Sequence, residues 1–147
     1  MSVSATVLVP AAPAEAWARW SDLAGWPGWN PYCVSARLDG PLAPGTSLAL
    51  QLRHPGGRDF WTRPTLTAVL PGAELSWEAR ALGLRAATET TLAAEGDRTR
   101  VTLNASARGP LGFTLRLTFS DKAQARMYVE MLDALRRSFA AGPAVAS

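Results

Sequence analysis

The chain has 147 residues, of which 48% are hydrophobic and 18% charged, a composition typical of a folded domain that excludes a disordered chain. Its formal charge is +3, but the arginines are scattered and the longest basic run is Arg136-Arg137, which argues against nucleic-acid binding. The only cysteine, Cys33, excludes an internal disulfide, and a single histidine, His54, argues against a metal site, so we expect no metal and no cofactor.

The sequence also lacks the features of membrane and secreted proteins. The N-terminus has no basic segment followed by an apolar one, and the longest apolar runs fall short of the ~20 residues that span a bilayer. We expect a cytoplasmic protein with no membrane span, folded as a single domain over residues 1–147.

The first elements are a strand and two short helices. The β-branched segment 2–9 predicts a strand that ends before a proline. Pro13–Trp20 predicts a helix with proline at its first position. A second short helical turn should follow and end at Gly25 and Pro27.

The next stretch, WPGWNPY at residues 26–32, concentrates three aromatic rings beside two prolines. Two interpretations stay open: Trp26 and Trp29 plug one end of the core, or the rigid rings form the rim of a pocket.

The middle of the chain predicts an antiparallel meander of about five strands, because alternating residues are separated by turn signals such as Pro71-Gly72 and Glu95-Gly96-Asp97. The segment 60–69 is interpreted as one of these strands. The large apolar residues place one row of each strand on the inner face: Leu48, Leu50, Leu52 and His54; Phe60, Thr62, Pro64 and Leu66; Leu75, Trp77 and Ala79; Thr88, Thr90 and Leu92; Val101, Leu103, Ala105 and Ala107.

The C-terminal part predicts one long helix over residues 120–141, closed by Gly142-Pro143, with an apolar stripe that includes Tyr128, Met131 and Leu135. The segment 111–119 fits a strand and a helix equally well by its periodicity.

The ordered set of motifs resembles a known superfamily. PAEAWARWSDLAGWPGWNPY, PLAPGTSLALQL, RPTLTAVLPGAELSWEAR, DRTRVTLNA and MLDALRR occur in the order typical of START-like, or Bet v 1-like (SRPBCC), proteins and span nearly the whole chain. The resemblance is greatest to their bacterial polyketide cyclase/dehydrase group. It implies an α+β helix-grip fold, with a curved antiparallel sheet wrapped around the C-terminal helix, and an apolar cavity between them. It also favours a helix for 111–119.

Related proteins often carry a histidine and an acid on two neighbouring late strands. The corresponding positions here are Thr88 and Ala105, so the resemblance implies that this acid–base pair is absent. The inner rows contain no Asp, Glu, Lys or Arg, and small residues such as Ala79 and Ala86 leave either space or a close helix contact. We therefore expect an apolar cavity with a few hydroxyl groups and no catalytic residue.

The expected function is the binding or carrying of a small hydrophobic molecule, lipid-like or aromatic, held by apolar burial at ~25 cal/mol per Å². Thr62, Thr88, Thr90 and Tyr128 would orient it. The full set of expected ligand-binding residues is Trp29, Tyr32, Leu50, Phe60, Thr62, Leu66, Trp77, Thr88, Thr90, Leu103, Ala105, Met127, Tyr128 and Met131.

Two other functions stay open. A polyketide cyclase or dehydratase would need His54 or Tyr128 to reach the substrate, although a histidine beside Pro-Gly-Gly is more typical of a solvated turn. An interaction module would display residues 26–32 and Trp61 as an exposed apolar patch. Cys33 is expected to be a small buried hydrophobe, and a homodimer stays open.

Overall fold

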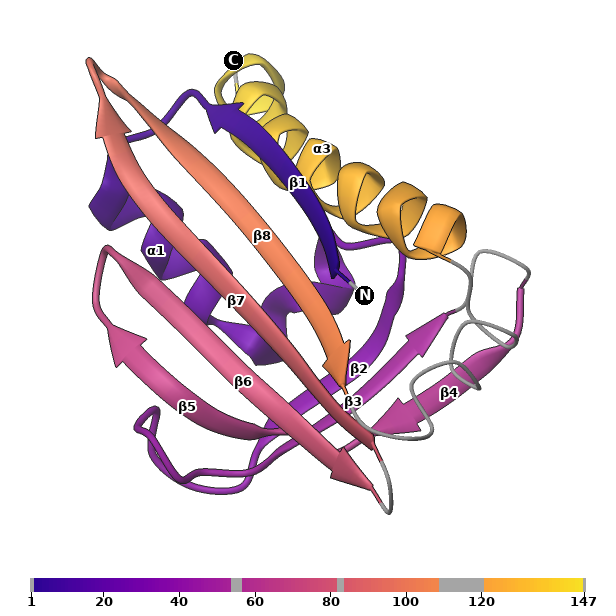
Figure 1. Ribbon diagram of the computed structural model, residues 1–147. Coiled ribbons are helices and arrows are strands. Elements are labelled where there is room, and N and C mark those ends of the chain that lie inside the picture. The colour runs from indigo at the N-terminus through magenta and orange to yellow at the C-terminus, as the bar shows by residue number, and fades with distance from the viewer. Residues whose placement is uncertain (1, 54–56, 82–83, 109–120, 147) are drawn as a thin grey trace.

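The computed structural model describes residues 2–53, 57–81, 84–108 and 121–146 (Figure 1). The elements follow one another as β1 (Ser2–Val9), α1 (Pro13–Ser21), the 3-10 helix η1 (Leu23–Gly28), β2 (Cys33–Leu38), β3 (Leu48–Arg53), β4 (Asp59–Thr62), β5 (Thr65–Leu70), β6 (Glu74–Ala81), β7 (Leu84–Glu95), β8 (Arg98–Arg108) and α3 (Asp121–Ala146). The predicted first strand and first helix are confirmed to within one residue.

The strands form two antiparallel sheets, one of five strands in the order β1-β8-β7-β6-β5 and one of three in the order β2-β3-β4. They join where the start of β3 meets the start of β5: the amide of Leu48 donates to the carbonyl of Pro64, and the amide of Leu66 donates to that of Thr46, each at 2.8 Å. The predicted curved antiparallel sheet is thus confirmed, and an isolated bridge between Ser47 and Thr65 links its two parts at this junction.

The long helix α3 contacts β1 and runs beside it in Figure 1. Its buried side chains include Met131, Leu132 and Leu135, the stripe predicted from the sequence. Helix α1 contacts β7 and β8. The helix-grip fold is therefore confirmed, and its inner face is shared between α3 and the α1–η1 segment.

The predicted strand over 60–69 is wrong in one respect, because the structure divides it into β4 and β5. Proline has no backbone N–H to donate to a ladder and interrupts pairing within a strand. The interruption falls at Arg63 and Pro64, so β4 pairs with β3 while β5 pairs with β6.

Strand β2 was not predicted. It pairs with β3, but the register shifts between Cys33 and Ser35, and such an irregularity destroys the strict alternation on which the prediction depends. Helix α3 also extends to Ala146, past Gly142 and Pro143, although an internal proline removes one helical hydrogen bond.

The turn between β5 and β6 follows the predicted chemistry. The amide of Ala73 donates to the carbonyl of Leu70 at 2.8 Å, with Pro71 and Gly72 between them. Gly72 has a φ of +78°, which the third position of a type II turn requires and which glycine adopts without strain. His54 and the segment 111–119, by contrast, lie outside the described residues.

Candidate functional site

A cavity of about 450 Å³ lies between the sheet and α3. Strands β3, β4, β6, β7 and β8 supply one wall and α3 supplies the other. The lining consists of Trp26, Leu50, Leu52, Phe60, Trp61, Thr62, Arg63, Pro64, Trp77, Ala79, Arg80, Ala86, Thr88, Leu103, Gln124, Met127, Tyr128 and Met131. Most of these side chains are apolar or aromatic, which is typical of sites for small molecules.

The structure brings many of the predicted ligand-binding residues together around this cavity. Those that line it are Leu50, Phe60, Thr62, Trp77, Thr88, Leu103, Met127, Tyr128 and Met131. They come from strands distant in sequence and from α3, and strand alternation together with the helical stripe was enough to select them.

Five predicted residues lie elsewhere: Trp29, Tyr32, Leu66, Thr90 and Ala105. The inner row of β7 shows why, since Ala86 and Thr88 line the cavity while Thr90, farther along, is fully buried in the core. Periodicity identifies the inner face but does not show how much of it the α1–η1 segment covers.

Several residues that line the cavity were not among the predicted ligand-binding residues. Trp61, Arg63 and Arg80 fall on rows that alternation assigns to the outer face, yet they border the cavity where β4 and β6 end. Ala79 and Ala86 were noted for their small volume, and that signal could have placed them in the site.

The stretch 26–32 combines both interpretations offered for it. Trp26 is 1% exposed, and its ring lies 4.6 Å from Trp20 and 5.9 Å from Trp77 between centroids. Its indole N–H donates to the carbonyl of Trp20 at 2.8 Å. Because Trp26 also lines the cavity, it packs the core with one part of its surface and walls the cavity with another.

An exposed aromatic patch at 26–32 is contradicted by the burial of Trp26 and Tyr32, which expose 1% and 8% of their surface. Trp29 is half-buried against Trp20 and Trp26 and borders a second, more polar pocket with Arg19 and Phe139. Trp61, by contrast, is 59% exposed. The predicted surface for a partner protein is therefore absent from this stretch.

Tyr128 is the cavity's titratable phenol. Burial raises its pKa to about 12, and a hydrogen bond with Thr88 opposes the rise. The phenol thus stays protonated at neutral pH, so it can donate a hydrogen bond to a ligand but is a poor general base. The lining contains no Asp or Glu.

Cys33 is buried, as predicted, and does not line the cavity. Burial raises the pKa of its thiol to about 11. The thiol is protonated at neutral pH and is not an activated nucleophile.

Tyr32 connects the aromatic stretch to α3. Its hydroxyl donates to Oε2 of Glu130 at 2.7 Å, while Nε of Arg126 donates to Oε1 at 2.8 Å. Both bonds lower the pKa of Glu130, and the bond from Arg126 has the larger effect. The position of α3 against the aromatic stretch thus depends on a charged hydrogen bond.

Tyr32→Phe is expected to lower the free energy of unfolding at pH 7 by about 0.5–1.5 kcal/mol, as a single lost hydrogen bond does. The pKa of Glu130 is lower in the folded protein than in the unfolded chain, where it is about 4.3. The stability that its carboxylate contributes is therefore present above about pH 4.3 and is lost as the pH falls through the folded pKa. Urea unfolding at several pH values should show the deficit shrinking below about pH 4.

A double-mutant cycle with Glu130→Ala, which removes the acceptor, isolates this pair from the Arg126 interaction. Additive losses in the two single variants would show that the two side chains do not stabilise each other.

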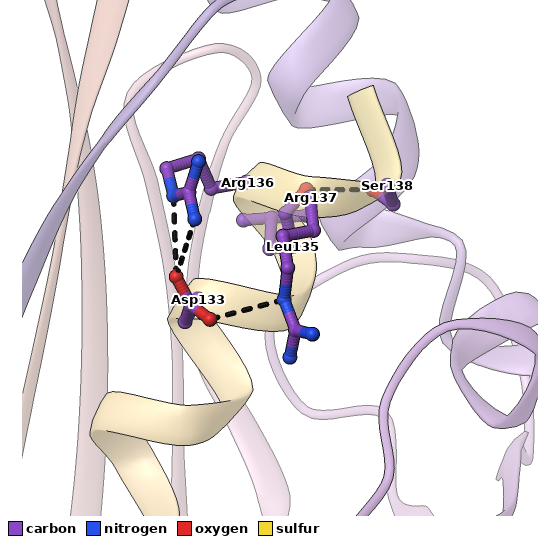
Figure 2. Close-up of polar contacts among 5 residues, drawn as sticks. All are labelled: Asp133, Leu135, Arg136, Arg137 and Ser138. Atoms are coloured by element: carbon purple, nitrogen blue, oxygen red, sulfur yellow. Dashed lines mark hydrogen bonds and ion pairs between the residues drawn. The ribbon is translucent and has the colours of Figure 1, made fainter. Parts of the chain in front are cut away.

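The outer surface of α3 carries ion pairs between residues of the helix itself. Asp133 accepts from Nη2 of Arg136 at 2.8 Å and from Nε of Arg137 at 3.0 Å, as Figure 2 shows. The hydrogen bond from Arg136 is the main cause that lowers the pKa of Asp133. Spacings of three and four residues on a helix favour such pairs, so these arginines serve the helix surface and not the cavity.

Comparison with known proteins places the chain in a family. Residues 1–140 match the family described as polyketide cyclase / dehydrase and lipid transport. The chain belongs to this family. None of the proteins of curated function matches it in sequence.

Solved structures share the fold of this family member. A START superfamily protein from Mycobacterium smegmatis has a TM-score of 0.74 at 16% identity, covering 94% of this chain and 96% of its own. TTHA0849 from Thermus thermophilus has a TM-score of 0.77 at 17% sequence identity, and the match covers 96% of this chain and 98% of TTHA0849.

The di-domain ARO/CYC protein StfQ of the steffimycin biosynthetic pathway is also similar, with a TM-score of 0.76 at 13% identity, covering 97% of this chain and 52% of its own. Identities this low establish a shared fold and leave activity open.

Among the described helices, none has the length and hydrophobicity needed to cross a membrane.

Proposed function

We propose that the protein binds and carries a small hydrophobic molecule in the cavity between the sheet and α3. The cavity itself supports the proposal most directly: about 450 Å³ lies within the range of about 300–1,000 Å³ typical of small-molecule sites. Its walls are built largely from Trp, Phe, Leu, Met and Ala side chains. An apolar ligand would gain about 25 cal/mol for each Å² that leaves water.

The polar groups of the cavity suit orientation of a ligand. Thr62 and Thr88 offer hydroxyls from the sheet, and Tyr128 offers a phenol from α3. Each can donate or accept a hydrogen bond without carrying a charge at neutral pH. Such groups would select how a carbonyl or hydroxyl of the ligand points, while the apolar walls supply affinity.

The first test is native mass spectrometry of freshly purified protein, followed by extraction of any bound molecule and titration with the neutral apolar dye N-phenylnaphthylamine. We expect a bound apolar molecule, or dye binding that saturates at one site. A clean mass combined with no saturable dye binding would refute the proposal.

A polyketide cyclase or dehydratase is the second candidate, and Tyr128 is the observation that favours it. Its protonated hydroxyl lies in the cavity wall beside Thr88 and could hydrogen-bond a substrate carbonyl during ring closure. The similarity of fold to StfQ agrees with this candidate without establishing it.

Tyr128→Phe separates the two candidates. If the protein only carries its ligand, dye affinity should change by about threefold or less, since one neutral hydrogen bond is lost. If it cyclises a polyketide, turnover of a reactive polyketide analogue should fall about a hundredfold or more while binding persists. The measurement pairs equilibrium titration with product analysis by liquid chromatography, and wild-type protein that forms no product above the buffer rate would exclude the enzymatic candidate for that analogue.

A further inference from the structure

We propose that the molecule bound in the cavity is an anionic amphiphile, with an apolar body between the sheet and α3 and an acidic group at the arginines of the mouth. This inference rests on the proposed function and adds the class of ligand. It depends on the charges that border the cavity, which composition and periodicity did not reveal.

The charged side chains of the lining are all cationic. Arg63 and Arg80 border the cavity, and the lining includes no carboxylate. Two guanidinium groups beside an apolar wall create a positive potential there, and low-dielectric walls strengthen such a potential. A neutral ligand would gain less from them than a carboxylate, sulfonate or phosphate, whose charge strengthens the hydrogen bonds that it accepts.

These arginines are not neutralised by the acids around them. Glu78 is shared, since its Oε1 lies 2.6 Å from Nε of Arg80 and 3.5 Å from Nε of Arg85. Arg63 has no ion pair within the part of the chain that the structure describes. One carboxylate therefore faces more than one guanidinium, and an excess of positive charge remains at the mouth.

Their positions fit the head of an amphiphile rather than its body. Arg63 follows Thr62 at the break between β4 and β5, and Arg80 follows Ala79 near the end of β6. Both arginines are exposed. The neighbouring apolar walls lead inward to the methionines of α3, so an apolar body can leave water while its acidic group stays hydrated.

Two dyes of matched shape test the inference: anilinonaphthalene sulfonate carries an anionic group that N-phenylnaphthylamine lacks. In Arg63→Gln, the dissociation constant of the sulfonate should rise about three- to fivefold, the effect of one exposed ion pair. The double variant with Arg80→Gln should show about a tenfold rise. The neutral dye should bind both variants as it binds wild type.

Arg98→Gln is the matched control. It removes the same charge from the first residue of β8, outside the cavity lining. It should leave both dyes unaffected. Raising salt to about 0.3 M should weaken binding of the sulfonate and not of the neutral dye.

The outcomes separate this inference from the proposed function. If both dyes bind but Arg63→Gln weakens them equally, or weakens the sulfonate no more than Arg98→Gln does, the anionic preference is refuted and the carrier function stands. If neither dye binds the wild type, the proposed function fails first.

A natural type of ligand provides the second measurement. Dodecanoate should displace N-phenylnaphthylamine from wild type at a lower concentration than dodecanol does, and Arg63→Gln should abolish that difference. An aromatic acid compared with its alcohol should behave in the same way. Equal displacement by acid and alcohol in both pairs would refute the inference.

Discussion

Trp26→Ala is expected to lower the free energy of unfolding by about 3–5 kcal/mol, the largest stability effect of any substitution we consider. Trp26 is 1% exposed and its ring contacts those of Trp20, Trp29 and Trp77. Truncation would leave a void among these rings and remove the indole N–H that donates to the carbonyl of Trp20. Both the lost packing and the unsatisfied carbonyl act in the same direction.

Urea unfolding followed by far-ultraviolet circular dichroism measures this loss without relying on tryptophan emission. Trp61→Ala is the matched control, because Trp61 is 59% exposed and its removal should change stability by about 0.5 kcal/mol or less. Equal losses in the two variants would mean that Trp26 does not hold the core as the structure indicates.

Ala86→Phe is expected to weaken ligand binding by about tenfold or more, equivalent to at least about 1.4 kcal/mol. Ala86 lines the cavity opposite α3, and a phenyl ring at this position would occupy space that a ligand needs. A packed core would resist such an enlargement with a stability loss of about 1–3 kcal/mol. An empty cavity accepts the ring, so Ala86→Phe should retain nearly all of the wild-type stability.

Ala87→Phe provides the comparison, since it adds the same ring to the opposite face of β7 at the adjacent residue. Titration of both variants with N-phenylnaphthylamine measures ligand affinity, and urea unfolding measures stability. Binding that is unchanged in Ala86→Phe would place the ligand elsewhere, and a large stability loss would show that side chains already fill the space.

Much of the fold follows from local patterns. The alternation of Leu75 and Trp77, the Pro71-Gly72 turn and the apolar stripe of α3 each predict their element, and their order along the chain resembles the START-like superfamily. The interruption at Pro64 and the irregular strand after Cys33 were missed because both break the period on which strand prediction depends.

The cavity was harder to predict than the fold. Alternation places Thr88 and Thr90 on the same face, but only Thr88 lines the cavity, because burial along β7 depends on which distant segment covers it. Alternation likewise assigns Arg63 and Arg80 to the outer face, although both border the cavity's mouth where their strands end. The alternation of residues along the sequence does not show where a curved sheet ends.

The interruption at Pro64 also determines which wall of the cavity can open most easily. Strand β4 spans only Asp59–Thr62 and lies at the edge of the described three-stranded sheet, where β3 is its neighbouring strand. Strand β7 is held on both sides by β6 and β8. Local opening in proteins requires the least free energy where the fewest hydrogen bonds break. Exchange of the β4 amide protons with solvent should therefore report opening of this wall of the cavity, while the five-stranded sheet stays closed.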